Sequence, residues 1–143
     1  MPRRTAKART SREPERDYSH RSLLDKLGIK AGQKIAVLDL EDSSFFKELA
    51  TRVPDFVRNS GGEDLDIVLL TANRVNDLPR LKSLANKIRK NGAIWVIYPK
   101  GQTHIREVDV IAAGKAAALV DNKVCRFSDT HTALRFVIPL ARR

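Results

Sequence analysis

The sequence of 143 residues lacks several features that mark large classes of protein. It contains one cysteine, Cys125, so the chain cannot form an internal disulfide. No apolar run approaches the roughly 18 residues that cross a bilayer, and we find no signal peptide at the start. These absences exclude a disulfide-stapled secreted domain and a membrane span. They predict a protein of the reducing cytoplasm.

Glycine is missing where a nucleotide-binding α/β domain needs it. Residues 34–40 (KIAVLDL) predict a buried strand that brings Asp39 to its carboxyl end, the edge where open α/β sheets bind ligands. Glu41, Asp42 and two serines follow, in place of a glycine-rich turn. Because glycine permits close approach of the backbone to a cofactor, we predict that the usual cofactor site is lost or rebuilt.

Motifs for catalysis or metal binding are also absent. The chain has no P-loop, no Gly-x-Ser-x-Gly elbow and no cysteine–histidine spacing typical of zinc, and its histidines are dispersed at positions 20, 104 and 131. A nucleophilic role for Cys125 would need a neighbouring histidine, and His131 lies in the following loop. A small buried hydrophobic residue is the commoner role for a lone cysteine. We therefore predict no catalytic residue, no metal site and no cofactor.

Positive charge is abundant: the net charge is +10. Residues 1–22 hold seven Lys/Arg and three Asp/Glu, a net of +4, so residues 23–143 account for the remaining +6. Residues 1–17 have no hydrophobic periodicity and predict a disordered basic tail. Nucleic acid or another polyanion is a plausible partner, although the charge is also explained by solubility alone. The candidate contacts in the tail are Arg3, Arg4, Lys7, Arg9 and Arg12.

The rest of the chain, residues 18–143, alternates between strand and helix patterns. Expected helices cover residues 22–28, 42–54, 77–90 and 103–119, and expected strands cover 34–40, 66–71, 93–98, 119–127 and 134–140. A very short strand at 56–58 is also expected. Asp42 or Ser43 caps the second helix, and Asn91-Gly92 ends the third, whose polar side carries five basic residues. That basic side is either a phosphate-contacting surface or an ordinary solvated face.

The order βα, βα, βα and then a hairpin predicts the fold class. Alternating strands and helices with right-handed crossovers give a parallel sheet between two helical layers. The five-residue link 128–132 favours an antiparallel hairpin at the end. We therefore predict a single Rossmann-like α/β domain, a three-layer sandwich whose mostly parallel sheet ends in an antiparallel C-terminal hairpin.

Residues 18–140 resemble a small bacterial family catalogued as a domain of unknown function, number three-zero-five-two. The resemblance rests on Lys26-Leu27-Gly28-Ile29, on Asp66-Ile67-Val68-Leu69, on Gly92-Ala93-Ile94-Trp95-Val96 with Pro99-Lys100, and above all on 119–125 (LVDNKVC) followed by 134–137 (LRFV). It implies a short Rossmann-like domain, bacterial and cytoplasmic, and brings no established activity.

Val37-Leu38-Asp39-Leu40 is similar, more distantly, to the opening motif of class I S-adenosylmethionine-dependent methyltransferases. Residues 66–68 and 91–96 resemble the fourth and fifth strands of that class. This chain departs from that class in two ways. It lacks the glycines after the first strand, and it has no clear counterpart of the ribose-binding acid after the second strand.

Three carboxylates crowd the end of the first strand. Asp39, Glu41 and Asp42, with Lys100 at a neighbouring strand end, form a candidate cleft for a polar ligand, an amine or a metal. The favoured alternative is structural: Asp42 caps a helix, Glu41 is solvated, and Asp39 bonds the backbone of the turn.

Asp121, Asn122 and Lys123 form a second candidate, a polar site on the first hairpin strand. Strand alternation predicts Asp121, Lys123 and Cys125 on one face. Asp121 and Lys123 on that face are either a ligand site near the sheet edge or an ion pair, with Arg135 nearby, that fixes the hairpin register.

The sequence thus favours a non-catalytic binding or regulatory module with weak electrostatic affinity for nucleic acid. The alternative is a degenerate or unusual S-adenosylmethionine-dependent methyltransferase. The oligomeric state is not predicted.

Overall fold

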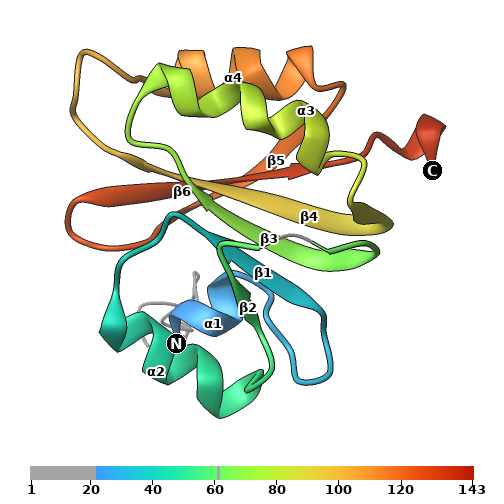
Figure 1. Ribbon diagram of the computed structural model, residues 1–143. Helices are drawn as coiled ribbons and strands as arrows, with labels where there is room; N and C mark the ends of the chain where they lie inside the picture. The colour runs from blue at the N-terminus through green and yellow to red at the C-terminus, as the bar shows by residue number, and fades with distance from the viewer. Residues whose placement is uncertain (1–21, 61) are drawn as a thin grey trace, which may run out of the picture.

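The structure of the protein, a computed structural model, describes residues 22–60 and 62–143. Within these residues six strands form one sheet in the order β2-β1-β3-β4-β6-β5 (Figure 1). The strands β1 to β4 are parallel, and β6 and β5 join them as an antiparallel hairpin. The predicted fold class is therefore confirmed. The strands are β1 (Ile35–Leu38), β2 (Val57–Arg58), β3 (Leu65–Thr71), β4 (Ile88–Pro99), β5 (Val120–Arg126) and β6 (His131–Val137).

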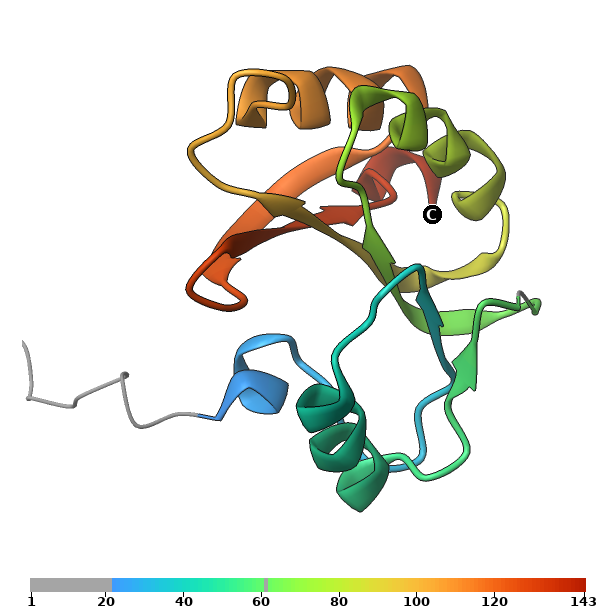
Figure 2. The same ribbon diagram turned by 60° about the vertical axis from the view of Figure 1, so that its left-hand side comes forward.

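Helices cover both faces of the sheet and make the other two layers. The views in Figures 1 and 2 agree that α3 and α4 lie over one face and that α1 and α2 lie under the other. None of the described helices has the length and apolar character needed to span a membrane. The helical segments are α1 (Leu23–Lys26), α2 (Ser43–Arg52), η2 (Val75–Arg80), α3 (Leu81–Leu84), α4 (Glu107–Ala116) and η3 (Leu140–Arg142).

The central strands are apolar on both faces because each face is covered. Val68 and Leu70 of β3 pack into the core shared with α3 and α4, and Ile67 and Leu69 pack into the core shared with α1 and α2. Trp95 of β4 is fully buried in the second core, and its indole Nε1 donates a hydrogen bond of 3.0 Å to the carbonyl oxygen of Leu27. This bond ties the end of the short α1 to the sheet.

The helix predicted over residues 77–90 is wrong in its second half. The helical segment ends at Leu84, and β4 begins at Ile88, so Asn91-Gly92 lies inside a strand instead of stopping a helix. The cause is pairing with β3, which places Leu65 opposite Ile88. A Cβ atom on Gly92 would lie 2.9 Å from the carbonyl oxygen of Leu65, so glycine serves here for a close approach between strands.

The C-terminal hairpin turns earlier than predicted. Its second strand begins at His131, and the connection is residues 127–130. Pro99, at the end of β4, lies opposite His131, so the hairpin connection reaches the edge formed by the carboxyl ends of the parallel strands. This placement brings hairpin residues to the edge where α/β sheets bind ligands.

The basic tail lies outside the described residues. This applies to Arg3, Arg4, Lys7, Arg9 and Arg12, and to the proposed boundary at residue 17.

Candidate functional site

A cavity of about 260 Å³ opens at the carboxyl ends of β1 and β3. Three segments line it: the loop after β1, the end of β3 with the residues that follow, and the β5–β6 connection. We call it the carboxyl-edge cavity. Its lining residues are Asp39, Leu40, Glu41, Asp42, Thr71, Asn73, Phe127, Ser128, Thr130 and His131.

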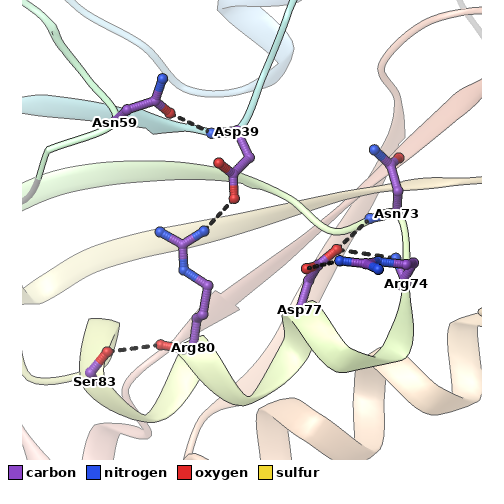
Figure 3. A network of polar contacts seen from close by, with 7 residues as sticks. All are labelled: Asp39, Asn59, Asn73, Arg74, Asp77, Arg80 and Ser83. Atoms are coloured by element: carbon purple, nitrogen blue, oxygen red, sulfur yellow. Dashed lines mark hydrogen bonds and ion pairs between the residues drawn. The ribbon is translucent and has the colours of Figure 1, made fainter.

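Asp39, which lines this cavity, has an unusual backbone conformation. Its φ of 59° is in the left-handed region, which aspartate tolerates better than most residues. Its main-chain N–H donates a 2.8 Å hydrogen bond to Oδ1 of Asn59, and its carboxylate forms an ion pair with the guanidinium of Arg80 (Figure 3). The turn is thus fixed by one residue after β2 and one from η2.

The other two predicted carboxylates have different tasks. Asp42 is the N-cap of α2, where its side chain accepts a 3.0 Å hydrogen bond from the N–H of Phe45. Glu41 is exposed and has no hydrogen-bond or ion-pair partner among the described residues. The structural interpretation is right for Asp42. That interpretation is wrong for Asp39, because its carboxylate forms an ion pair with Arg80 and does not bond the backbone of the turn.

Lys100 does not join the acidic residues in lining the cavity. It follows β4, and its main-chain N–H donates a 3.0 Å hydrogen bond to the carbonyl oxygen of Thr130. Lys100 therefore follows a neighbouring strand, as predicted, but hairpin residues line the cavity in its place, so the candidate cleft holds the three acids without the amine.

Thr71, which sequence reasoning missed, is the one buried polar residue of the described core. Only 6% of it is exposed, and its hydroxyl has no hydrogen-bond partner among the described residues. A buried hydroxyl without a partner costs roughly 1–3 kcal/mol. Thr71 also lines the carboxyl-edge cavity.

Asn73 ties the loop after β3 to the hairpin and to the loop before α4. Its Oδ1 lies 3.1 Å from Nε2 of His131, and its carbonyl oxygen accepts a 3.0 Å hydrogen bond from Nε2 of His104. Nδ1 of His131 lies 2.8 Å from the hydroxyl of Thr130. Histidines that are 27 positions apart in the sequence thus meet at one asparagine.

Burial lowers the pKa of His131 below its ordinary value. The neutral imidazole is therefore the favoured form near neutral pH. In that form one ring nitrogen donates to Asn73 while the other accepts from Thr130. The sequence offered one clue to this network, namely that Thr71 and Asn73 stand at the end of a buried strand.

The polar site predicted on the first hairpin strand is divided by a β-bulge. Asp121 lies opposite Phe136, whereas Lys123 lies opposite Arg135. Directly opposed residues of antiparallel strands share a face, so Asp121 and Lys123 lie on opposite faces. The predicted common face for Asp121, Lys123 and Cys125 is wrong, because the extra residue Asn122 breaks the alternation.

Cys125 remains on the same face as Lys123. It is half-buried and packs against the core shared with α1 and α2. Desolvation raises the pKa of its thiol, which disfavours the nucleophilic thiolate. These observations agree with the role of a small hydrophobic residue.

Comparison with protein-family models gives no match for this chain, and comparison with curated proteins gives none either. Solved structures do match. An S-adenosylmethionine-dependent methyltransferase from Aquifex aeolicus aligns with a TM-score of 0.64 and 11% identity, over 81% of this chain and 87% of the other. One from Bacteroides fragilis, solved with S-adenosyl-L-homocysteine, aligns with a TM-score of 0.59 and 10% identity, over 80% and 75%. A TehB-like methyltransferase from Corynebacterium glutamicum aligns with a TM-score of 0.54 and 11% identity, over 81% and 85%.

These identities establish a shared fold and no more. The Rossmann-like fold predicted from the sequence is confirmed and is shared with these methyltransferase structures, while membership of the domain family numbered three-zero-five-two is not confirmed. The expectation of a non-catalytic module is contradicted, because the structures that share the fold are described as methyltransferases.

Proposed function

We propose that this chain binds S-adenosylmethionine in the carboxyl-edge cavity and catalyses methyl transfer from it. The observation that carries the proposal is the unpartnered hydroxyl of Thr71, which is buried beside an acidic cavity at the ligand-binding edge of a methyltransferase fold. When bound, the cofactor would supply an electrophilic methyl group on a cationic sulfur.

The charge of the cavity agrees with this cofactor. S-adenosylmethionine carries an ammonium and a sulfonium against a single carboxylate, so its net charge is positive. Asp39, Glu41 and Asp42 line the cavity; Asp39 is paired with Arg80 and Asp42 caps α2, so Glu41 is the one of the three whose carboxylate has no partner among the described residues. Burial lowers the pKa of His131 and so favours its neutral form. The acids that replace the glycines thus attract the cationic groups, although they take space that a glycine turn would leave open.

The remaining wall offers contacts for the rest of the molecule. Leu40 and Phe127 are both buried and present apolar surface. Thr71 offers a hydroxyl that can donate or accept. Contact with the cofactor would therefore run through side chains, where glycine-containing relatives would use bare main chain.

The position after β2 departs from the class. Asn59 stands where a ribose-binding acid is expected, and its Oδ1 is engaged by the N–H of Asp39. Its amide nitrogen and one lone pair of its Oδ1 remain for a hydroxyl group. This departure is the reason to describe the proposed enzyme as unusual.

Asn73 and His131 would orient groups at the cavity wall. Oδ1 of Asn73 receives the imidazole N–H, which leaves the Nδ2 donors of the same amide without a partner among the described residues. We propose that His131 positions this amide and that Nδ2 of Asn73 donates to the methyl acceptor.

The test is calorimetry of the full chain with S-adenosylmethionine and with S-adenosylhomocysteine, which lacks the sulfonium charge. We expect the charged cofactor to bind more tightly. Thr71→Val should weaken binding about 5- to 15-fold, as expected for one lost hydrogen bond of roughly 1–1.5 kcal/mol. Thr51→Val, on the exposed surface of α2, is the matched control and should bind like the wild type.

Release of S-adenosylhomocysteine from the cofactor in a dialysed cell extract measures transfer itself, with Thr71→Val as the comparison. Absence of cofactor binding at millimolar concentration would refute the proposal.

Three finer expectations belong to the same proposal. The resemblance over residues 18–140 supports membership of the bacterial family numbered three-zero-five-two. The single cysteine supports a cytoplasmic location. The composition of residues 1–17 supports a basic tail attached to one domain, with a polyanion as its partner.

A further inference from the structure

Five basic residues between positions 80 and 90 were predicted to share one helical face, and the structure separates them. Three form ion pairs with carboxylates, whereas Lys82 and Lys90 have no ion-pair or hydrogen-bond partner for their ammonium groups among the described residues. The three pairs are Arg80 with Asp39, Lys87 with Glu63 at 3.5 Å, and Arg89 with Asp66 at 3.1 Å.

The two free lysines line the same cavity, which has a volume of about 310 Å³. Arg142 of η3 and Asn86 line it as well, and no acidic side chain does. It lies where β4 begins, β6 ends and α4 leads into β5, which is the edge opposite the carboxyl-edge cavity. We call it the amino-edge cavity.

The partial negative charge at a helix C-terminus explains only one of the three cations that line this cavity. Cations are favourable near the carbonyl groups at the C-terminus of a helix, and α4 ends at this cavity. Arg142 serves that purpose, because its Nη1 donates a 2.5 Å hydrogen bond to the carbonyl oxygen of Ala118. Neither Lys82 nor Lys90 donates from its ammonium group to any described carbonyl. They line the cavity together with a third cation and without a carboxylate, an arrangement that favours an anion.

We propose that the amino-edge cavity binds phosphate groups of an anionic ligand. Lys82 and Lys90 would contact phosphate oxygens as mobile point charges, and the remaining N–H groups of Arg142 would donate directed hydrogen bonds. The amide of Asn86 lies in the same wall and offers a neutral donor. This site is independent of the proposed methyl transfer, since it lies at the other edge of the sheet.

The test compares two double variants of the full chain. Lys82→Gln with Lys90→Gln removes the free lysines of the cavity. Lys30→Gln with Lys47→Gln removes two exposed lysines elsewhere and leaves the same net charge. All four positions are exposed, so both proteins should keep the wild-type circular dichroism spectrum and unfolding midpoint.

Two probes distinguish the source of the phosphate. Tripolyphosphate, followed by calorimetry, represents a small ligand, and a labelled DNA duplex of about 20 base pairs, followed by anisotropy over a salt series, represents nucleic acid. We expect the cavity variant to lose at least tenfold in affinity for the probe that binds, while the control stays within twofold of the wild type. For the duplex, the slope of log affinity against log salt should also fall by about 1.8, the value for two lost contacts.

A loss of affinity that is confined to the variant of Lys82 and Lys90 supports the proposal, and the probe for which it occurs identifies the source of the phosphate. Equal loss in the two variants, or no binding of either probe by the wild type, would overturn it.

Discussion

Asp39 shows how a single position can be held in an uncommon conformation by neighbours from distant parts of the chain. A left-handed φ costs roughly 1–2 kcal/mol for most residues. The amide of Asn59 and the guanidinium of Arg80 oppose that cost, and the two come from segments 20 and 41 positions away. The orientation of the loop that follows, including Glu41, depends on both contacts.

Titration of His131 gives a prediction at the same scale. Burial lowers its pKa in the folded protein, so the unfolded chain binds a proton more readily. Stability from this group is present above the ordinary value of roughly 6.5 and is lost as the pH falls toward the lowered value. His131→Gln should therefore lose less stability than the wild type between about pH 7.5 and 5.5.

Urea unfolding at the two pH values measures this difference. Carboxylates titrate in both proteins and cancel in the comparison. An equal change in the free energy of unfolding for the two proteins would contradict the assignment.

Single residues of the site were predictable to the extent that they follow a recognisable strand. Asp39 and Asp42 were found because they lie within four residues of the end of the apolar run 35–38. Thr71 and Asn73 follow an equally clear strand, but a hydroxyl and an amide carry no distinctive pattern. The contact between Asn73 and His131 joins positions 58 apart, and only the hairpin topology brings them together.

At the scale of elements, strand pairing decides the structure of residues 88–92. Helical spacing continues through Ile88, which is why the sequence predicts a longer helix there. Pairing with Leu65 of β3, and the 2.9 Å hydrogen bond from its N–H to the carbonyl oxygen of Lys87, draw the segment into the sheet. Such long-range pairing overrides local propensity and cannot be read from a window of ten residues. The bulge at Asn122 escaped prediction for the same reason.

Gly92 tests this account of β4. Gly92→Ala should destabilise the protein by about 1–3 kcal/mol, because the new methyl group would press on main-chain oxygens of Leu65 and Asp66. Gly62→Ala is the control: its Cβ would lie at an ordinary 3.6 Å from the side chain of Leu65. Denaturant unfolding of both variants decides the matter, and equal midpoints would show that close strand approach does not explain the glycine.

At the scale of the whole molecule, the sheet separates two kinds of charge. The carboxyl-edge cavity is lined by three acids, and the amino-edge cavity by three cations, within a protein whose net charge is +10. The alternation of strands and helices predicted the architecture, since a parallel sheet leaves few other solutions. The composition predicted the overall sign of the charge. Composition could not predict that acidic and basic residues line cavities at opposite edges of the sheet, because the fold determines at which edge each residue lies.

The most direct test of the central claim is amide NMR of the full chain during titration with S-adenosylmethionine. We predict that the largest shifts fall on residues of the carboxyl-edge cavity, including Glu41, Thr71 and Asn73, and that Thr71→Val reduces them at equal concentration. Unchanged spectra, or shifts confined to residues outside that cavity, would contradict the account.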